Sequence, residues 1–207
     1  MDAVARELAE VGRRFYQRGW VMGTSGNLSV VIDRDPLRVA MTPSGAHKGH
    51  LRPDQILTVD AGANVVGEAG GRPSAEALLH LELISGRGAG AVLHTHSIWS
   101  TILSDRSAAA GALDIHGYEM LKGLDGVTSH DHRERIPILD NDQDMTRLSA
   151  VVRRVLGESG GAHAFLLRRH GLYTWGRTLG DAERHVEILE FLFEAIGRSG
   201  HGPGAHS

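Results

Sequence analysis

The hexapeptide Ala91-Val92-Leu93-His94-Thr95-His96 joins an apolar run to two histidines and is the most informative stretch of the sequence. Its composition predicts a buried strand over Ala89–His96. Side chains two residues apart on a strand share a face and lie about 6.6–6.8 Å apart along the chain, so both imidazoles can converge on one ion. Two adjacent buried imidazoles without a shared partner would be costly, which indicates a metal site where the strand emerges.

A second apolar strand, expected over Ala164–Arg169, is also followed by a histidine, His170. Gly171 comes next and permits a sharp backbone turn and the close approach of a substrate. Three histidines with an open fourth position are typical of a catalytic divalent site, usually zinc. Three neutral imidazoles leave the charge of the ion unneutralised, which suits an enolate or a polarised carbonyl.

The composition excludes several kinds of cofactor and partner. The chain has 207 residues, 13 His, 27 Gly, no Cys and a formal net charge of -3. Lack of cysteine excludes disulfides, thiolate-bound zinc, iron–sulfur clusters and thiol nucleophiles. The charge balance gives no reason to expect a nucleic-acid or membrane partner. An acidic start and the absence of an apolar run of about 18 residues predict a cytoplasmic protein without a signal peptide or membrane span.

The order of elements predicts an α/β protein with a mixed or largely antiparallel sheet between helices, rather than a βαβ repeat. Residues 1–197 are interpreted as one domain, and residues 198–207, rich in glycine, as a disordered tail. Helices are expected at residues 2–18, 74–86, 98–104, 143–156 and 181–196. Strands are expected at Leu28–Ile32, Arg38–Met41, Gln55–Val59, Asn64–Val66, Ala89–His96, Ile136–Leu139, Ala164–Arg169 and Leu172–Trp175.

Two short loops combine hydroxyl side chains with glycine: Thr24-Ser25-Gly26-Asn27 and Thr42-Pro43-Ser44-Gly45. Backbone N–H groups, hydroxyls and amides can bind a phosphate without a P-loop. Either loop alone is an ordinary turn. Together, and with Lys48 close behind the second, they indicate a phosphate clamp. A substrate with a carbonyl that binds the metal and a phosphate that binds the loops would be a sugar phosphate.

Other histidines and acids could also bind a metal ion, but surface or loop positions are favoured for most of them. Glu76 and His80 lie four residues apart on an expected helix and could chelate an ion, but for His80 a solvent-facing position is favoured. His130-Asp131-His132 repeats the spacing of the first motif within a polar segment, where a loop is favoured over a second metal site. The remaining histidines are interpreted mostly as surface residues: His47, His50, His116, His163, His185, His201 and His206.

Five motifs occur in the order and spacing of the class II aldolase/adducin family, which the chain resembles from about residue 7 to residue 196. They are Gly26-Asn27-Leu28-Ser29, Thr42-Pro43-Ser44-Gly45, Pro73-Ser74-Ala75-Glu76, His94-Thr95-His96 and His170-Gly171. Two longer blocks, at residues 116–123 and 168–176, resemble a branch of the family that removes water from its substrate.

The resemblance implies a three-layer α/β/α fold around a nine-stranded, mostly antiparallel sheet, and a homotetramer with its active sites at subunit interfaces. It implies one Zn²⁺ per subunit, bound by His94, His96 and His170. It also implies phosphate contacts from residues in the loops and in the Pro73 motif; with the loop argument above, the expected substrate-binding set is Gly26, Asn27, Ser44, Gly45, Ser74 and Lys48.

In the dehydratase branch, the position matching Glu119 is the acid/base, whereas the aldolases use the position matching Glu76. Glu119 is therefore the first candidate and Glu76 the second, as auxiliary base or metal ligand. A carboxyl that donates a proton at neutral pH needs a raised pKa, so a partly buried site is expected for Glu119. The alternatives are a sugar-phosphate aldolase or epimerase of the fuculose or ribulose type, and an adducin-like binding module without catalysis, which the three intact histidines disfavour.

Overall fold

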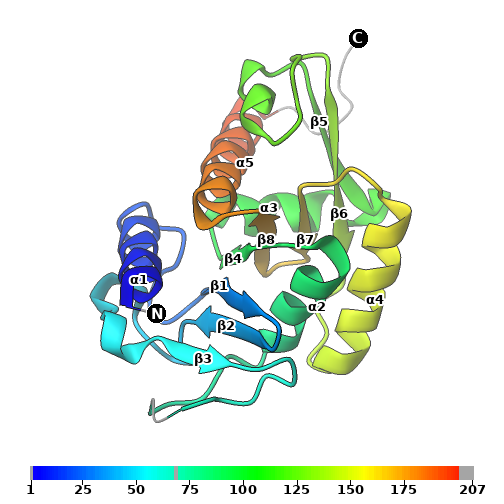
Figure 1. Ribbon diagram of the computed structural model, residues 1–207. Helices are drawn as coiled ribbons and strands as arrows, with labels where there is room; N and C mark the ends of the chain where they lie inside the picture. Colours follow the sequence, from blue (N-terminus) through cyan, green and yellow to red (C-terminus); the bar gives the residue numbers. More distant parts are fainter. Residues whose placement is uncertain (1, 68–69, 201–207) are drawn as a thin grey trace.

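An eight-stranded sheet forms the centre of the computed structural model, which describes residues 2–67 and 70–200 (Figure 1). The strand order is β3-β2-β1-β4-β8-β7-β6-β5, which places β4 and β8 side by side in the middle. The strands are β1 (Asn27–Arg34), β2 (Leu37–Met41), β3 (Leu57–Val59), β4 (Ala91–Thr95), β5 (Ala112–His116), β6 (Arg133–Leu139), β7 (Ala164–Leu167) and β8 (Gly171–Gly176).

Helices cover both faces of this sheet. The α-helices are α1 (Asp2–Gln17), α2 (Ala77–Arg87), α3 (Ile98–Arg106), α4 (Met145–Glu158) and α5 (Leu179–Ser199), and short 3₁₀ helices are η1 (Lys48–His50), η2 (Pro53–Gln55), η3 (Ala108–Ala110) and η4 (Glu119–Gly123). Helices α2 and α4 lie together on one side, while α1 and α5 lie on the other (Figure 1). The predicted three-layer α/β/α architecture is confirmed.

Side chains alternate across the central strands, as a sheet covered on both faces requires. Val92, Tyr173 and Trp175 join the apolar cluster that contains residues of α2 and α4. Their neighbours Leu93 and Leu172 belong to the clusters built with α1, α3 and α5. The central strands are consequently buried throughout, and polar side chains gather where these strands end.

The sheet is mostly antiparallel, as predicted, but the number of strands differs. Within residues 2–67 and 70–200, β6 and β7 form the one parallel pair. The expectation of nine strands is wrong for these residues, since the predicted strand at Asn64–Val66 is reduced to an isolated bridge between Val59 and Val65. Asp60 Oδ1 accepts the backbone N–H groups of Gly62 and Asn64 and closes a tight turn. Across this turn the backbone N–H groups of Asp60 and Val66 donate to the carbonyl oxygens of Asn64 and Thr58.

Helix α5 begins earlier and ends later than predicted. Thr178 is its N-cap, three residues before the predicted start of the helix, and Asp181 completes a capping box as the third helical residue. The helix runs to Ser199 and ends at Gly200 in the left-handed conformation, so residues 198 and 199 of the predicted tail are helical. Residues 201–207 lie outside the described part. No helix in that described part is long and apolar enough to cross a membrane.

Candidate metal centre and adjoining cavity

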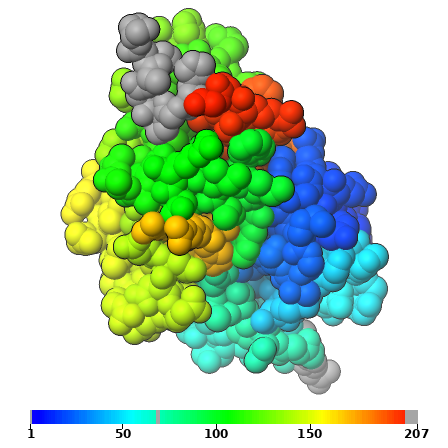
Figure 2. Space-filling view, turned by 180° about the vertical axis from the view of Figure 1, so that it is seen from behind, coloured from blue at the N-terminus to red at the C-terminus, as the bar shows by residue number. Residues whose placement is uncertain are grey.

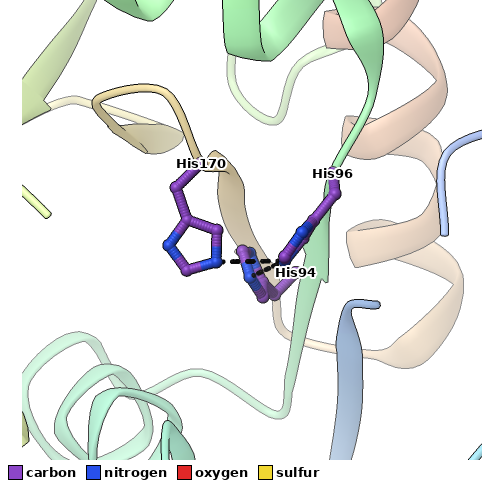
Figure 3. A group of neighbouring side chains, drawn as sticks. All are labelled: His94, His96 and His170. Carbon is purple, nitrogen blue, oxygen red and sulfur yellow. Dashed lines mark hydrogen bonds between the residues drawn. The ribbon is translucent and has the colours of Figure 1, made fainter. Parts of the chain in front are cut away.

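Three imidazoles meet at the end of the central strands (Figure 3). His94 lies in β4, His96 follows that strand, and His170 lies in the turn before β8. His96 Nε2 is 2.7 Å from His94 Nε2 and 3.1 Å from His170 Nε2. The ligand atoms of all three lie within 4.8 Å of one another, so the predicted triad is brought together.

The ring of His94 is held in the orientation that a metal ligand needs. Its Nδ1 lies 2.9 Å from the carbonyl oxygen of Leu172 and donates to it, which leaves the Nε2 lone pair free to face the other two rings. Tyr173 stacks against His94 with ring centroids 3.9 Å apart, and Phe165 stacks against Tyr173 in turn. This column of rings prevents the imidazole from turning away.

All three imidazoles are kept neutral, which is the form that binds a metal. Burial is the main cause: it lowers the pKa of His94 well below its usual value, that of His96 to about 4, and that of His170. Neighbouring imidazoles lower the pKa of His94 and His96 further. The Nε2 atom of His96 lies 2.7 Å from that of His94 and 3.1 Å from that of His170. Neutral imidazole nitrogens gathered this closely are suited to bind a divalent cation.

Glu76 adds a carboxylate to this centre. It is the residue before α2, and its oxygens lie 3.5 Å from His94 Nε2 and 3.3 Å from His170 Nε2. Asn27 Nδ2 donates to Glu76 Oε2 across 2.6 Å. Burial and the nearby Glu76 carboxylate both raise the pKa of the Tyr173 hydroxyl. Glu76 is therefore in position to act as a fourth ligand or as a base beside a bound ion.

The solvent-facing position expected for His80 is wrong. His80 is fully buried, its Nδ1 accepts from Ser29 Oγ across 2.7 Å, and its Nε2 donates to the Asn27 side-chain oxygen. Burial lowers its pKa to about 3, so the ring is neutral and donates through one nitrogen only. This contact fixes the Asn27 amide with its NH₂ group toward Glu76. A pattern of i,i+4 spacing could not show that β1 would cover this face of the helix.

A cavity of about 310 Å³ adjoins the triad and contains every substrate-binding residue expected from the sequence. Its walls come from the two hydroxyl-and-glycine loops, the residues before α2, and one triad member. The lining residues are Thr24, Ser25, Gly26, Asn27, Pro43, Ser44, Gly45, Lys48, Ser74, Glu76 and His96. Hydroxyls, backbone N–H groups and one ammonium therefore face a space next to the candidate metal centre.

Lys48 supplies the positive charge of this cavity from a buried position. Its Nζ donates to the carbonyl oxygens of Thr24 and Ala46, each across 3.0 Å, which leaves a third N–H without a partner among these contacts. Burial lowers the Lys48 pKa to about 8. The two backbone contacts join both loops to one cation, so the ammonium is held in place before any anion arrives.

Two glycines are required here by the close approach of backbone. Gly26 has φ +70, and a Cβ on it would lie 2.6 Å from the His94 carbonyl oxygen. At Gly171 the expected sharp turn is wrong: the left-handed residue is Arg169, with φ +54. A Cβ on Gly171 would instead collide with the Thr95 carbonyl, so this glycine permits β4 and β8 to pack closely beside the triad.

Glu119 does not lie in this centre within one chain. It begins η4, its side chain is 73% exposed, and Lys122 Nζ donates to it across 2.7 Å. The expected partial burial and raised pKa are wrong for the single chain, because the contact with Lys122 lowers the Glu119 pKa. Glu119 is absent from the residues lining the cavity.

The turn that carries His170 is anchored on the outer surface. Arg168 and Arg169 each place Nε 2.9 Å from Asp105 Oδ1, on α3. Ser104 Oγ accepts the backbone N–H of Arg169. Figure 2 shows this turn, coloured orange, at the surface beside the green segment of α3. The third imidazole is thus positioned by α3, a helix that the sequence alone did not connect with it.

Glu190 is a buried acid beneath the triad that sequence reasoning did not identify. It lies in α5 with 3% exposure, and Thr95 Oγ1 donates to its Oε1 across 2.8 Å. Burial, together with the charge of Glu194, raises the Glu190 pKa to about 7. In the sequence, Glu190 and Glu194 are two glutamates four residues apart on one helix. Their spacing does not show that one is buried and the other exposed.

We expect Glu190→Gln to remove a pH-dependent loss of stability. The folded-state pKa is about 7 against 4.5 for the exposed group, so the folded chain binds the extra proton between these values. Unfolding free energy therefore falls as pH rises through this window, by up to about 3 kcal/mol, and the cost is complete above pH 7. The variant should melt higher than the parent at pH 8 and equally at pH 4.5. A constant difference in Tm across that range would contradict this assignment.

The fold and its imidazole centre are those of a known protein family. Residues 6–196 match the Class II Aldolase and Adducin N-terminal domain, and the chain belongs to the class II aldolase and adducin family. The solved L-fuculose-1-phosphate aldolase from Thermus thermophilus has the same fold, with a TM-score of 0.75, 23% identity and coverage of 100% of both chains.

Two relatives with higher sequence identity than this aldolase share the same name. The methylthioribulose-1-phosphate dehydratase of Pseudomonas savastanoi pv. phaseolicola is 46% identical to this chain over 194 residues, 93% of either sequence. The protein of the same name from Methylococcus capsulatus is 45% identical over 191 residues, covering 92% of this chain and 91% of its own length. The similarity therefore extends over nearly the whole of both proteins.

Proposed function

We propose that the chain is a hydro-lyase that converts 5-methylthioribulose 1-phosphate to 2,3-diketo-5-methylthiopentyl 1-phosphate in methionine salvage. The observation that carries this proposal is the cavity that joins a neutral imidazole triad to two hydroxyl-and-glycine loops and a buried lysine. Relatives named for this dehydratase, 45–46% identical over nearly the whole chain, support the particular substrate.

His94, His96 and His170 would hold one divalent ion per subunit, for which we propose Zn²⁺. When bound, such an ion supplies a Lewis acid that polarises a carbonyl and stabilises negative charge on its oxygen. Glu76, adjacent to two of the triad nitrogens, can take the role of auxiliary base toward a proton on the neighbouring carbon. Asn27 keeps the Glu76 carboxylate oriented through its 2.6 Å hydrogen bond.

The loops bind the phosphate at the other end of the cavity in this proposal. Gly45 leaves open space beside its Cα, while Ser44 and Ser74 offer hydroxyl groups in the lining of the same volume. The Lys48 ammonium supplies the one lysine or arginine charge among the lining residues. Anchoring the phosphate there would direct the carbonyl end of an extended ketose toward the triad.

Glu119 is the proposed acid that protonates the departing hydroxyl at C4, and we assign it to the site of a neighbouring subunit in a homotetramer. Its exposed position away from the triad of its own chain leaves it available to a second copy. Removal from water at such an interface would raise its pKa and give it the proton that an exposed carboxylate lacks at neutral pH.

The test of the function is a product assay on 5-methylthioribulose 1-phosphate with and without a chelator. We expect one water lost per substrate, a diketone product, and activity that a chelator abolishes and Zn²⁺ restores. Release of dihydroxyacetone phosphate would instead identify a carbon–carbon lyase of the aldolase type. Failure of the purified chain to bind any divalent ion would contradict both enzymes and favour a binding module.

We expect Lys48→Met to impair substrate binding more than turnover. Loss of a charge-assisted contact to phosphate costs about 1.5–3 kcal/mol, so KM should rise roughly 10- to 100-fold while kcat changes less. In the parent, KM should also rise above pH 8 as Lys48 loses its proton, and the variant should lack this rise. Arg6→Met, at an exposed position of α1, is the matched control. A fall in kcat at unchanged KM would contradict a phosphate-binding role.

A further inference from the structure

A second group of metal-ligating side chains lies outside the cavity described above. His132 immediately precedes β6, Glu134 lies in that strand, and His163 immediately precedes β7. His132 Nε2 and His163 Nδ1 each lie 2.9 Å from the same atom, Glu134 Oε2. The three ligand atoms are within 4.8 Å of one another, as in the triad. The sequence favoured a loop position for His132 and a surface position for His163, and the structure brings both imidazoles to one buried carboxylate.

The charge of Glu134 requires a cation at this position. Its side chain is 1% exposed, and across residues 2–67 and 70–200 its ion-pair partners are the two histidines, with no lysine or arginine among them. A buried carboxylate is stable only when a positive charge and hydrogen bonds compensate it. Either a protonated imidazole or a bound metal ion can supply that charge, and both would occupy the space between the same three atoms.

The outer contacts of this group orient its side chains as a metal site requires. His163 Nε2 lies 2.8 Å from the Asp125 carbonyl oxygen and donates to it, so Nδ1 faces Glu134 in a fixed direction. The backbone N–H of His163 donates to Glu134 Oε1 across 2.9 Å, which fixes the carboxylate as well. Metal-binding histidines characteristically donate their second ring nitrogen to a carbonyl, and metal-binding carboxylates are themselves hydrogen-bonded.

Access from solvent is also present. The side chain of His132 is 31% exposed and that of His163 is 15% exposed, so an ion can enter and water can complete its coordination. We propose that His132, Glu134 and His163 bind a second first-row divalent cation of the Zn²⁺ type. Two imidazoles and one carboxylate form a mixed nitrogen and oxygen ligand set that suits such ions.

The site would join the segment from Asp125 to Glu134 with His163, which lies 29 residues beyond Glu134. Asp125 lies just after η4, which carries Glu119, and the ligands belong to the starts of β6 and β7. A bound ion would hold the end of that loop against the sheet. This proposal stands on the ligand geometry alone, so it does not depend on the reaction proposed for the first centre.

Metal binding by a variant that lacks the first centre tests the proposal. Chelator-treated His96→Ala/His170→Ala protein is titrated with Zn²⁺ against a chromophoric zinc indicator. We expect one ion per chain, against two in the parent, and a rise in Tm on adding Zn²⁺. Adding Glu134→Gln should weaken this binding at least 100-fold, since loss of a ligand exceeds the roughly 10- to 100-fold cost of an outer contact. Adding His130→Ala, an exposed histidine of the same loop, should change nothing.

Two results would overturn the proposal. If the His96→Ala/His170→Ala protein binds no Zn²⁺, a protonated histidine compensates the charge of Glu134 and no metal ion is bound there. If Glu134→Gln leaves binding intact, the ion lies elsewhere. Because Glu134 is buried, His132→Ala at the more exposed ligand serves as a second variant, with circular dichroism to confirm that each protein folds.

Discussion

Replacing His96 by alanine is expected to remove the ion from the first centre and to lower kcat/KM at least about 1,000-fold. His96 Nε2 lies between its two partners, at 2.7 Å from His94 and 3.1 Å from His170, so its loss leaves two separated ligands. Lewis-acid stabilisation is worth several kcal/mol, and each factor of ten in rate corresponds to about 1.36 kcal/mol. Metal content by mass spectrometry and initial rates on the ketose phosphate measure both effects.

The control for this variant is His50→Ala, which removes an exposed imidazole outside the cavity. It should retain the metal content and rate of the parent. Full activity in His96→Ala protein that has lost its bound ion would show that the reaction does not need the triad. Retention of the ion with loss of activity would move the role of His96 from metal binding to the substrate.

The second large effect is expected for Glu119→Gln, which should keep the metal and lose dehydration by about 100- to 10,000-fold, the usual contribution of a general acid. Glutamine preserves size and hydrogen bonding but has no proton of suitable pKa. Because Glu119 is exposed and does not line the cavity of its own chain, the loss should arise between subunits. Glu158→Gln, at an exposed position on α4, is the matched control.

Mixed oligomers separate the two possible origins of the Glu119 effect. Co-refolding Glu119→Gln chains with His96→Ala chains pairs an intact triad with an intact acid whenever the two meet across an interface. We expect partial recovery of activity in the mixture and none in either variant alone. No recovery in mixed oligomers of confirmed composition would place Glu119 and the triad within one chain, or remove Glu119 from the reaction in favour of Glu76.

Much of the site could be predicted from the sequence because its chemistry is local. His94 lies in β4 and His96 directly follows that strand, while Lys48 begins η1 only three residues after Gly45. These short spacings decide which side chains face together. The end of a buried strand was sufficient to connect His170 with them. The two loops then supplied the cavity walls, and every residue expected there lines the same volume.

What could not be predicted depends on contacts between distant segments. The burial of His80 follows from its packing against β1, and the pKa of Glu190 follows from the packing of α5 beneath β4. The cluster at Glu134 needs His163, which lies 29 residues away along the chain. The segment expected as a further strand at Asn64–Val66 makes one bridge, between Val59 and Val65. None of these outcomes is encoded in a periodicity that a short window can detect.

The pairing of β4 with β8 also joins parts of the chain that are synthesised at different times. His96 and His170 are separated by 74 positions, and the pairing of β8 with β4 brings the third imidazole to the other two. The two segments that carry the imidazoles are therefore synthesised far apart and meet only when the strands pair. The metal binding that we propose for these three side chains would require the central sheet to be assembled first.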